Sequence, residues 1–227
     1  MKSKIYKFIF LLFFSLNISN VNCQEQFSFD VTQIDILENG NLFIGTKRGT
    51  IISNNGIIIN ADQFEYQKKL NILNANGNVK IIDHINNFEI YSDNITYEKN
   101  DNFIFTDKNS KAFDLRNNFE INAYRFEYNI TKNIIIAKNN AVIENKTENY
   151  KISSNQITYF ANKNKIFSTG KTTADIFSKY RLISEDVTYL GDLRQFSSKK
   201  KTIVKDKLNL YNLEKFSYQI DKEILKG

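Results

Sequence analysis

The stretch Ala61-Asp62-Gln63-Phe64-Glu65-Tyr66 decides the fold, because the phrase it spells returns along the chain at a nearly fixed interval. Its closing tyrosine recurs every 29 to 31 residues, at Tyr97, Tyr128, Tyr159, Tyr189 and Tyr218. A period of about 20–50 residues is typical of proteins built from stacked repeats. We therefore expect one elongated repeat domain in which neighbouring copies share a continuous core.

Each copy contains two segments with the pattern of a β-strand. In the first segment, Phe64 and Tyr66 flank a polar residue, and this period of two indicates a strand with one buried face. The second segment begins seven residues after each tyrosine and places a large apolar residue two positions before a small one, as in Leu73 and Ala75. Polar residues between the two segments predict tight turns.

A degenerate copy precedes the first complete one, with Ile34-Asp35-Ile36 in the tyrosine segment and Phe43 and Gly45 in the second segment. Seven copies with two strands each predict about fourteen strands from about residue 28 onward, so the fold class is all-β. Two architectures fit this pattern. One is a parallel β-solenoid and the other is an elongated antiparallel jellyroll of two facing sheets, and the period alone does not separate them.

The N-terminus has the pattern of an export signal. Lys2, Lys4 and Lys7 precede an apolar run of nine residues, 8–16, which is too short to cross a bilayer as a helix. Cleavage after Cys23 would remove the chain's one cysteine, so residues 1–23 are predicted to be a signal peptide. The alternative of a lipidated Cys23 is disfavoured by Asn22 before it. The remaining domain, 24–227, cannot be stabilised by disulfides.

Two further features concern the partners of the domain. The formal net charge of +6 favours anionic partners such as phosphates, membrane surfaces or nucleic acid, unless it reflects a general lysine bias. The sequence also stops within the second segment of its last copy, where Leu225 and Gly227 take the large and small positions. We expect that the domain is truncated at this end, or that its open strand edge pairs with a partner, with a frayed tail as the ordinary alternative.

The segment 61–66, followed by Leu73-Asn74-Ala75-Asn76-Gly77-Asn78-Val79-Lys80-Ile81, resembles the repeat of the OstA-like family of lipopolysaccharide transport proteins. The resemblance is good over residues 61–82 and looser to the end of the chain. Later copies depart from it, since Lys108 and Asn139 replace the glycine at position 77 and only Gly170 restores it.

The resemblance implies an elongated two-sheet β-jellyroll, often called a β-taco, whose groove carries lipopolysaccharide acyl chains in the periplasm. Partners would be lipopolysaccharide and other transport proteins of the family, joined by β-strand addition at open edges. The chain most resembles the periplasmic part of the family member that continues into an outer-membrane barrel, and next a short soluble bridge. This implies an exported protein of the periplasm, associated with the outer membrane, that is no enzyme and binds no cofactor and no nucleic acid.

The resemblance and the strand pattern together select candidate groove residues. Their inward columns would hold acyl chains, although core packing explains the same pattern equally well. The candidates are Phe64, Tyr66, Leu73, Ala75, Val79, Ile81, Ile95, Tyr97, Ile104, Phe126, Tyr128, Ile135, Ile157, Tyr159 and Ile166. The small residues among these columns would leave room between the sheets, because a packed core favours larger side chains there.

Phosphates of the lipid head group would need cations at the rim of the groove. Arg194, Lys199, Lys200 and Lys201 are the candidate phosphate contacts, with a solvated turn as the ordinary alternative.

No catalytic chemistry is visible in the sequence. His84 is the one histidine, and no zinc spacing, phosphate-binding loop or nucleophile motif occurs. We therefore expect no catalytic residue and no metal site. The main alternative to transport is an exported structural or adhesive β-solenoid without lipid cargo. A carbohydrate-active solenoid would need a cluster of carboxylates that interrupts the repeat, and no copy has one.

Overall fold

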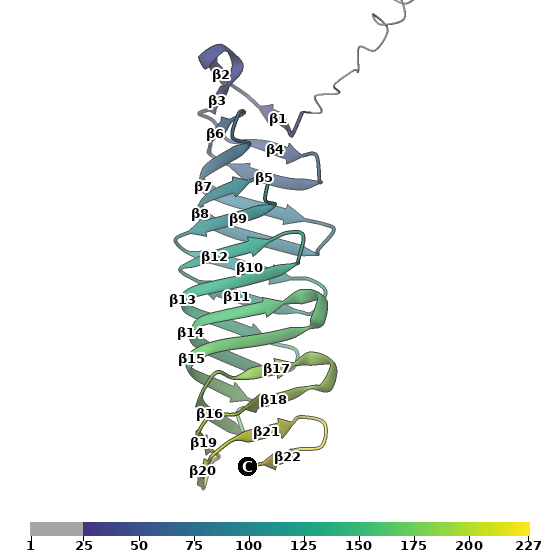
Figure 1. The fold of residues 1–227 in the computed structure, drawn as a ribbon, viewed down its shortest axis with the longest axis vertical. Coiled ribbons are helices and arrows are strands. Elements are labelled where there is room, and N and C mark those ends of the chain that lie inside the picture. The colour runs from purple at the N-terminus through teal and green to yellow at the C-terminus, as the bar shows by residue number, and fades with distance from the viewer. Residues whose placement is uncertain (1–24) are drawn as a thin grey trace, which may run out of the picture.

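The computed structural model describes residues 25–227, which form a tall stack of antiparallel strands (Figure 1). The strands run across the long axis of the molecule and succeed one another along it, from the purple N-terminal part to the yellow C-terminal part. Helical structure in this range consists of three single turns, η1 (Glu38–Gly40), η2 (Ala161–Lys163) and η3 (Gly191–Leu193). The all-β jellyroll prediction is confirmed, and the antiparallel pairing excludes a parallel solenoid. The predicted signal peptide, residues 1–23, lies outside the described residues.

Strand pairing traces two facing layers. Layer A contains, in spatial order, β2 (Ile34–Leu37), β3 (Leu42–Gly45), β6 (Gln63–Gln67), β7 (Ile72–Asp83), β8 (Phe88–Glu98), β9 (Phe103–Asp107), β12 (Arg125–Asn129), β13 (Ile134–Asn145), β14 (Tyr150–Phe160), β15 (Lys165–Ile176), β17 (Thr188–Leu190), β18 (Gln195–Ser198), β21 (Phe216–Gln219) and β22 (Ile224–Lys226).

Layer B shares the long strands β7, β8, β13, β14 and β15 with layer A, through their other halves. Its remaining strands are β1 (Phe27–Val31), β4 (Gly49–Ser53), β5 (Ile57–Ala61), β10 (Ser110–Asp114), β11 (Phe119–Ala123), β16 (Tyr180–Glu185), β19 (Thr202–Lys205) and β20 (Leu210–Leu213).

The two layers are joined along one edge, which we call the corner edge. There the long strands bend from one layer into the other, and the pairing register shifts, as between Asn76 and Val79 or between Lys138 and Ala141. The opposite edge carries the hairpin turns of both layers, and we call it the mouth. Layer A contributes turns such as 99–102 and 130–133, and layer B contributes turns such as 84–87 and 115–118.

Each bend depends on a residue in the left-handed region. Gly77, Lys108, Asn139 and Gly170 have φ angles of 76°, 66°, 64° and 78°, and they occupy the same position of successive copies. Glycine adopts this conformation without steric cost, whereas a residue with a Cβ is strained by it. Lys108 and Asn139 therefore keep the left-handed conformation of this position although they are not glycine.

Replacing Lys108 with glycine is expected to raise the free energy of unfolding by about 0.5–1.5 kcal/mol, because the φ of 66° would no longer be strained. The Lys108 side chain is exposed, so little packing is lost. Chemical denaturation of the variant measures the change. As a control, Lys151→Gly in the exposed face of β14 should lower the free energy of unfolding by about 0.5–1 kcal/mol. If both variants lower the free energy of unfolding by the same amount, the left-handed conformation of Lys108 is not strained as described.

The expected number of about fourteen strands is wrong as a total, since the described range contains 22 strands. Fourteen strand segments do lie in layer A, the layer that carries the repeated tyrosine. The prediction of two facing sheets is right, but the count left out the additional strands of layer B. Ile59, Ile90, Ile121 and Ile152 recur there every 31 residues, and this signal is weak because isoleucine is frequent throughout the chain.

The outer face of layer B is polar and carries ion pairs between neighbouring strands. The Glu120 carboxylate on β11 accepts contacts from Lys111 at 2.7 Å and from Lys146 at 2.8 Å. The hydrogen bonds from these two ammonium groups lower the pKa of Glu120 to about 2. These charged side chains thus lie on the outer face of layer B, whereas its apolar face packs against layer A in the interior.

The stack ends in unpaired strands at both ends. In the described range, β1 pairs only with β4 and β2 only with β3 at the N-terminal end. At the C-terminal end, β20 pairs only with β19 and β22 only with β21. Each layer therefore presents one free strand edge at each end of the stack.

Candidate functional site

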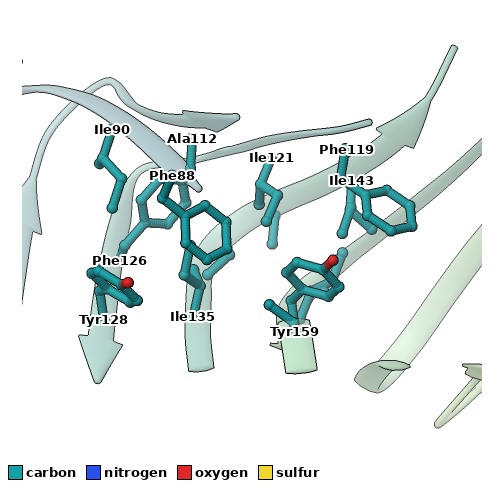
Figure 2. Close-up of a cluster of buried hydrophobic side chains, with 14 of the residues drawn as sticks. Phe88, Ile90, Ala112, Phe119, Ile121, Phe126, Tyr128, Ile135, Ile143 and Tyr159 are labelled. Carbon is teal, nitrogen blue, oxygen red and sulfur yellow. The ribbon is translucent and has the colours of Figure 1, made fainter. Parts of the chain in front are cut away.

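The interior between the layers contains all fifteen groove residues selected from the sequence. None of them is more than 4% exposed, so the repeat pattern identified the inward face correctly. Thirteen of the fifteen lie in layer A, and Val79 and Ile81 lie in the half of β7 that belongs to layer B. Figure 2 shows part of this interior, with Phe126, Tyr128, Ile135 and Tyr159 opposite a second row of apolar side chains.

That second row is the wall formed by layer B, which the sequence reasoning largely missed. Its members are buried residues of β4, β5, β8, β10, β11, β13, β14, β15, β16 and β19. They include Ile51, Ile57, Ile59, Phe88, Ile90, Ala112, Phe119, Ile121, Ile143, Tyr150, Ile152, Ala174, Leu182 and Val204. A signal was present in the sequence, since Phe88/Ile90 and Phe119/Ile121 alternate like a strand and are 31 residues apart.

Aromatic rings join the two walls. The Phe88 ring on layer B lies 5.5 Å from the Tyr128 ring on layer A, and the Phe119 ring lies 5.1 Å from that of Tyr159. Both pairs meet edge to face, which is a favourable geometry for aromatic rings. Side chains of the two layers thus fill the interior in this conformation.

The small residues of the repeat have a different role from the one expected. Ala75, Thr106, Ala137 and Ser168 are buried beside the bends at the corner edge. The layers converge there because one strand runs through both, so a large side chain has no space. The buried hydroxyls bond to one another, as Thr172 does to Ser168 at 2.7 Å. Small size at these positions allows the strands to bend and does not widen the interior.

Hydrogen bonds from the repeated tyrosines close the mouth. The Tyr128 hydroxyl donates to Asp83 Oδ2 at 2.6 Å, and the Tyr159 hydroxyl donates to Asp114 Oδ2 at 2.6 Å. Each bond connects layer A to a layer B turn 45 residues earlier in the chain. Both aspartates are only 2% exposed, and both tyrosines are fully buried. We call Tyr128–Asp83 and Tyr159–Asp114 the mouth latches.

Two neighbouring copies close the mouth with other partners. The Asn55 side chain donates to the Tyr97 hydroxyl at 3.1 Å, and the Tyr189 hydroxyl donates to Glu148 at 2.9 Å. Burial raises the pKa of Tyr97 to about 12. Burial, reinforced by the nearby aspartates, also raises the pKa of the tyrosines in both mouth latches. These hydroxyls therefore keep their protons and act as donors at neutral pH.

The structure does not bring the four candidate phosphate contacts together. Lys199, Lys200 and Lys201 lie at the corner edge, between β18 and β19. Arg194 lies at the mouth, where its guanidinium contacts Asp221 and Glu148. Their nearness in the sequence was misleading because a strand of layer A separates the two edges.

Residues 25–227 contain neither a candidate metal site nor a candidate membrane-spanning helix. No group of three or more His, Cys, Asp or Glu residues could hold a metal ion in this range. His84 is exposed in a layer B turn at the mouth. Within the same residues, no helix has the length and apolar character needed to cross a membrane.

The fold and its interior define a class of protein, the two-layer antiparallel β-jellyroll with an apolar interior. Residues 37–141 match the family described as "Lipopolysaccharide-assembly, LptC-related". The match covers less than half of the chain, and it agrees with the resemblance to the OstA-like family of lipopolysaccharide transport proteins. It also agrees with the expectation that the chain is not an enzyme.

Comparison with other proteins gave two further results. A solved structure of LptH from Pseudomonas aeruginosa, described as the LptA homologous periplasmic component of the lipopolysaccharide transport device, is similar over 50% of this chain and 81% of that chain. The sequence identity is 14% and the TM-score is 0.45. No curated protein matches the sequence.

Proposed function

We propose that this protein takes part in lipopolysaccharide transport by holding acyl chains between its two layers. One observation carries the proposal: within residues 25–227, an apolar interior lined from both layers runs through successive copies, and charged side chains meet it only at the mouth. The family match supports the same class of cargo. The groove residues named above would then line the path of the acyl chains.

The energetics favour an acyl chain as the guest. Each methylene removed from water contributes roughly 0.8 kcal/mol, so a chain of about ten methylenes gains on the order of 8 kcal/mol. If the two layers separate and an acyl chain lies between them, their apolar side chains contact the acyl chain and remain shielded from water. The packing of Phe88 against Tyr128, for example, would give way to packing of both rings against hydrocarbon.

The head group of such a lipid would remain outside the interior, at the mouth. Arg194 is the one candidate phosphate contact on that edge, and its guanidinium is well suited to bind a phosphate. Lys199, Lys200 and Lys201 lie on the other edge, so we propose no phosphate site that combines all four residues.

The free strand edges at both ends suit pairing with other members of the family by strand addition. An edge joined in this way would continue both walls and the interior between them. We propose a location in the periplasm, next to the outer membrane. The chain would be the periplasmic part of the barrel protein LptD, or else a bridge similar to LptA.

Photo-crosslinking tests the cargo. A photoreactive phenylalanine analogue replaces Phe126, which is fully buried in the interior, and in a second variant it replaces Phe113 on the outer face of β10. We expect lipopolysaccharide adducts from position 126 and none from position 113. An interior that yields no adduct, in a protein that remains folded, would favour the structural or adhesive alternative.

A further inference from the structure

The two edges of the stack differ in how they hold the layers together. At the corner edge, the backbone itself continues from one layer into the other through β7, β8, β13, β14 and β15. At the mouth, no backbone–backbone hydrogen bond joins a layer A turn to a layer B turn within residues 25–227. Side chains alone close this edge, so the layers can separate here without the loss of any strand pairing.

The mouth latches also leave the turns intact when they break. Asp83 Oδ1 accepts a hydrogen bond from the backbone N–H of Asn86 at 2.9 Å. Asp83 Oδ2 accepts another from the side-chain Nδ2 of Asn86 at 2.8 Å. Asp114 holds its turn in the same way, through the amides of Arg116 and Asn117. Each aspartate therefore shapes its own turn independently of the tyrosine across the mouth.

The latches are confined to the middle of the stack. The position occupied by Asp83 and Asp114 becomes Asn145 and then Ile176 in later copies. In the part of the chain that the structure describes, the Tyr218 hydroxyl donates to no carboxylate, although the side chain is only 2% exposed. Near it the mouth is crossed by the exposed ion pair of Lys179 and Glu223 at 2.7 Å. Exposed pairs of this kind are weak.

From these observations we propose that the mouth is a lateral gate, closed by the Tyr128–Asp83 and Tyr159–Asp114 latches, through which an acyl chain enters the interior from the side. The proposal rests on the proposed function for the nature of the guest. The gate itself is a property of the protein alone and can be measured without lipid.

The first experiment measures opening in the absence of lipid. Spin labels are attached to cysteines at Ile85, which is 73% exposed, and at the exposed Thr131, on opposite sides of the mouth. We expect one short distance between the labels in the otherwise unchanged protein. The double variant Tyr128→Phe/Tyr159→Phe should add a population at longer distance. Tyr218→Phe is the matched control, because it removes a buried hydroxyl from the same repeat position without removing a latch, and it should add none.

The second experiment measures entry of the guest. Hexa-acylated lipopolysaccharide is the probe, and formation of adducts at position 126 is followed with time. Each latch is a hydrogen bond to a charged group, and bonds of this kind are among the stronger ones in proteins. Loss of both latches in Tyr128→Phe/Tyr159→Phe should therefore make opening easier and accelerate lipid uptake by roughly tenfold or more. Tyr218→Phe should take up lipid at the unchanged rate.

A locked protein separates gating from loss of stability. A cleavable bis-maleimide that bridges cysteines at positions 85 and 131 holds the mouth shut while the rest of the fold stays intact. Uptake should fall at least tenfold and recover when the bridge is cleaved. If the locked protein takes up lipid at the normal rate, or if the latch variants show neither opening nor faster uptake, the gate is refuted. If the variants open but no form of the protein binds lipid, the gate stands and the proposed function fails.

Discussion

Replacing Phe88 with alanine is expected to lower the free energy of unfolding by about 3–5 kcal/mol, the usual cost of removing a large aromatic side chain from a core. Phe88 is 1% exposed, and its ring packs against the rings of both Tyr128 and Tyr159. The substitution creates a cavity between the walls at the position where two successive copies meet. Equilibrium denaturation by urea measures the change.

Phe113→Ala is the control for this prediction. Phe113 lies on the outer face of β10, is partly exposed and contacts the Tyr91 ring there. Its removal should cost about 1 kcal/mol, because little apolar area returns to water. Similar losses in the two variants would show that the layers do not pack against each other as described.

Replacing Asp114 with leucine is expected to cost about 3 kcal/mol, since several donors would lose their shared acceptor. The carboxylate accepts bonds from the amides of Arg116 and Asn117, from the Asn117 side chain and from the Tyr159 hydroxyl. An unsatisfied buried donor costs roughly 1–3 kcal/mol, and the turn amides recover part of this from water at the mouth. The free energy of unfolding measures the total.

The matched control is Asp175→Leu in β15. Asp175 is more exposed and pairs with Arg181 at 2.6 Å on the surface. Its loss should change the free energy of unfolding by less than about 1 kcal/mol. Asp114→Asn should lie between the two results, because the amide oxygen still accepts a hydrogen bond but carries no charge. A negligible effect of Asp114→Leu would mean that the carboxylate neither shapes the turn nor closes the mouth.

The sequence predicted one wall of the interior well. The tyrosine at positions 66, 97, 128 and 159 indicated both the period and the inward face of layer A, because a strand exposes alternate residues to opposite sides. Layer B was harder to predict. Its inward column of Ile59, Ile90, Ile121 and Ile152 does repeat every 31 residues, but isoleucine is frequent throughout the chain and marks the period less clearly than tyrosine does.

The mouth latches show why a periodic signal was not enough. Asp83 and Asp114 are 31 residues apart, so the sequence does contain an acidic column in phase with the tyrosines. Each tyrosine, however, meets the aspartate 45 residues before it, and this offset depends on how the two layers are staggered. Stagger is a property of the folded stack and not of any one copy.

The bends at the corner edge show a second limit. Gly77 and Gly170 are easily read as left-handed positions, but Lys108 and Asn139 have the same conformation without the same sequence signal. Neighbouring strand pairs impose the conformation on them. The small residues beside the bends were read as open space for the same reason, because the convergence of the layers was not visible in the sequence.

A complete copy contributes two segments to layer A and two to layer B, and this even number has a consequence for length. Adding or deleting one copy leaves the direction of the terminal strands unchanged, so the ends keep the same shape for docking. Neighbouring strands are about 4.8 Å apart, and each copy therefore extends both walls by about 10 Å. The span of the protein is thus adjustable in fixed steps, by duplication of a single unit, without any redesign of its joints.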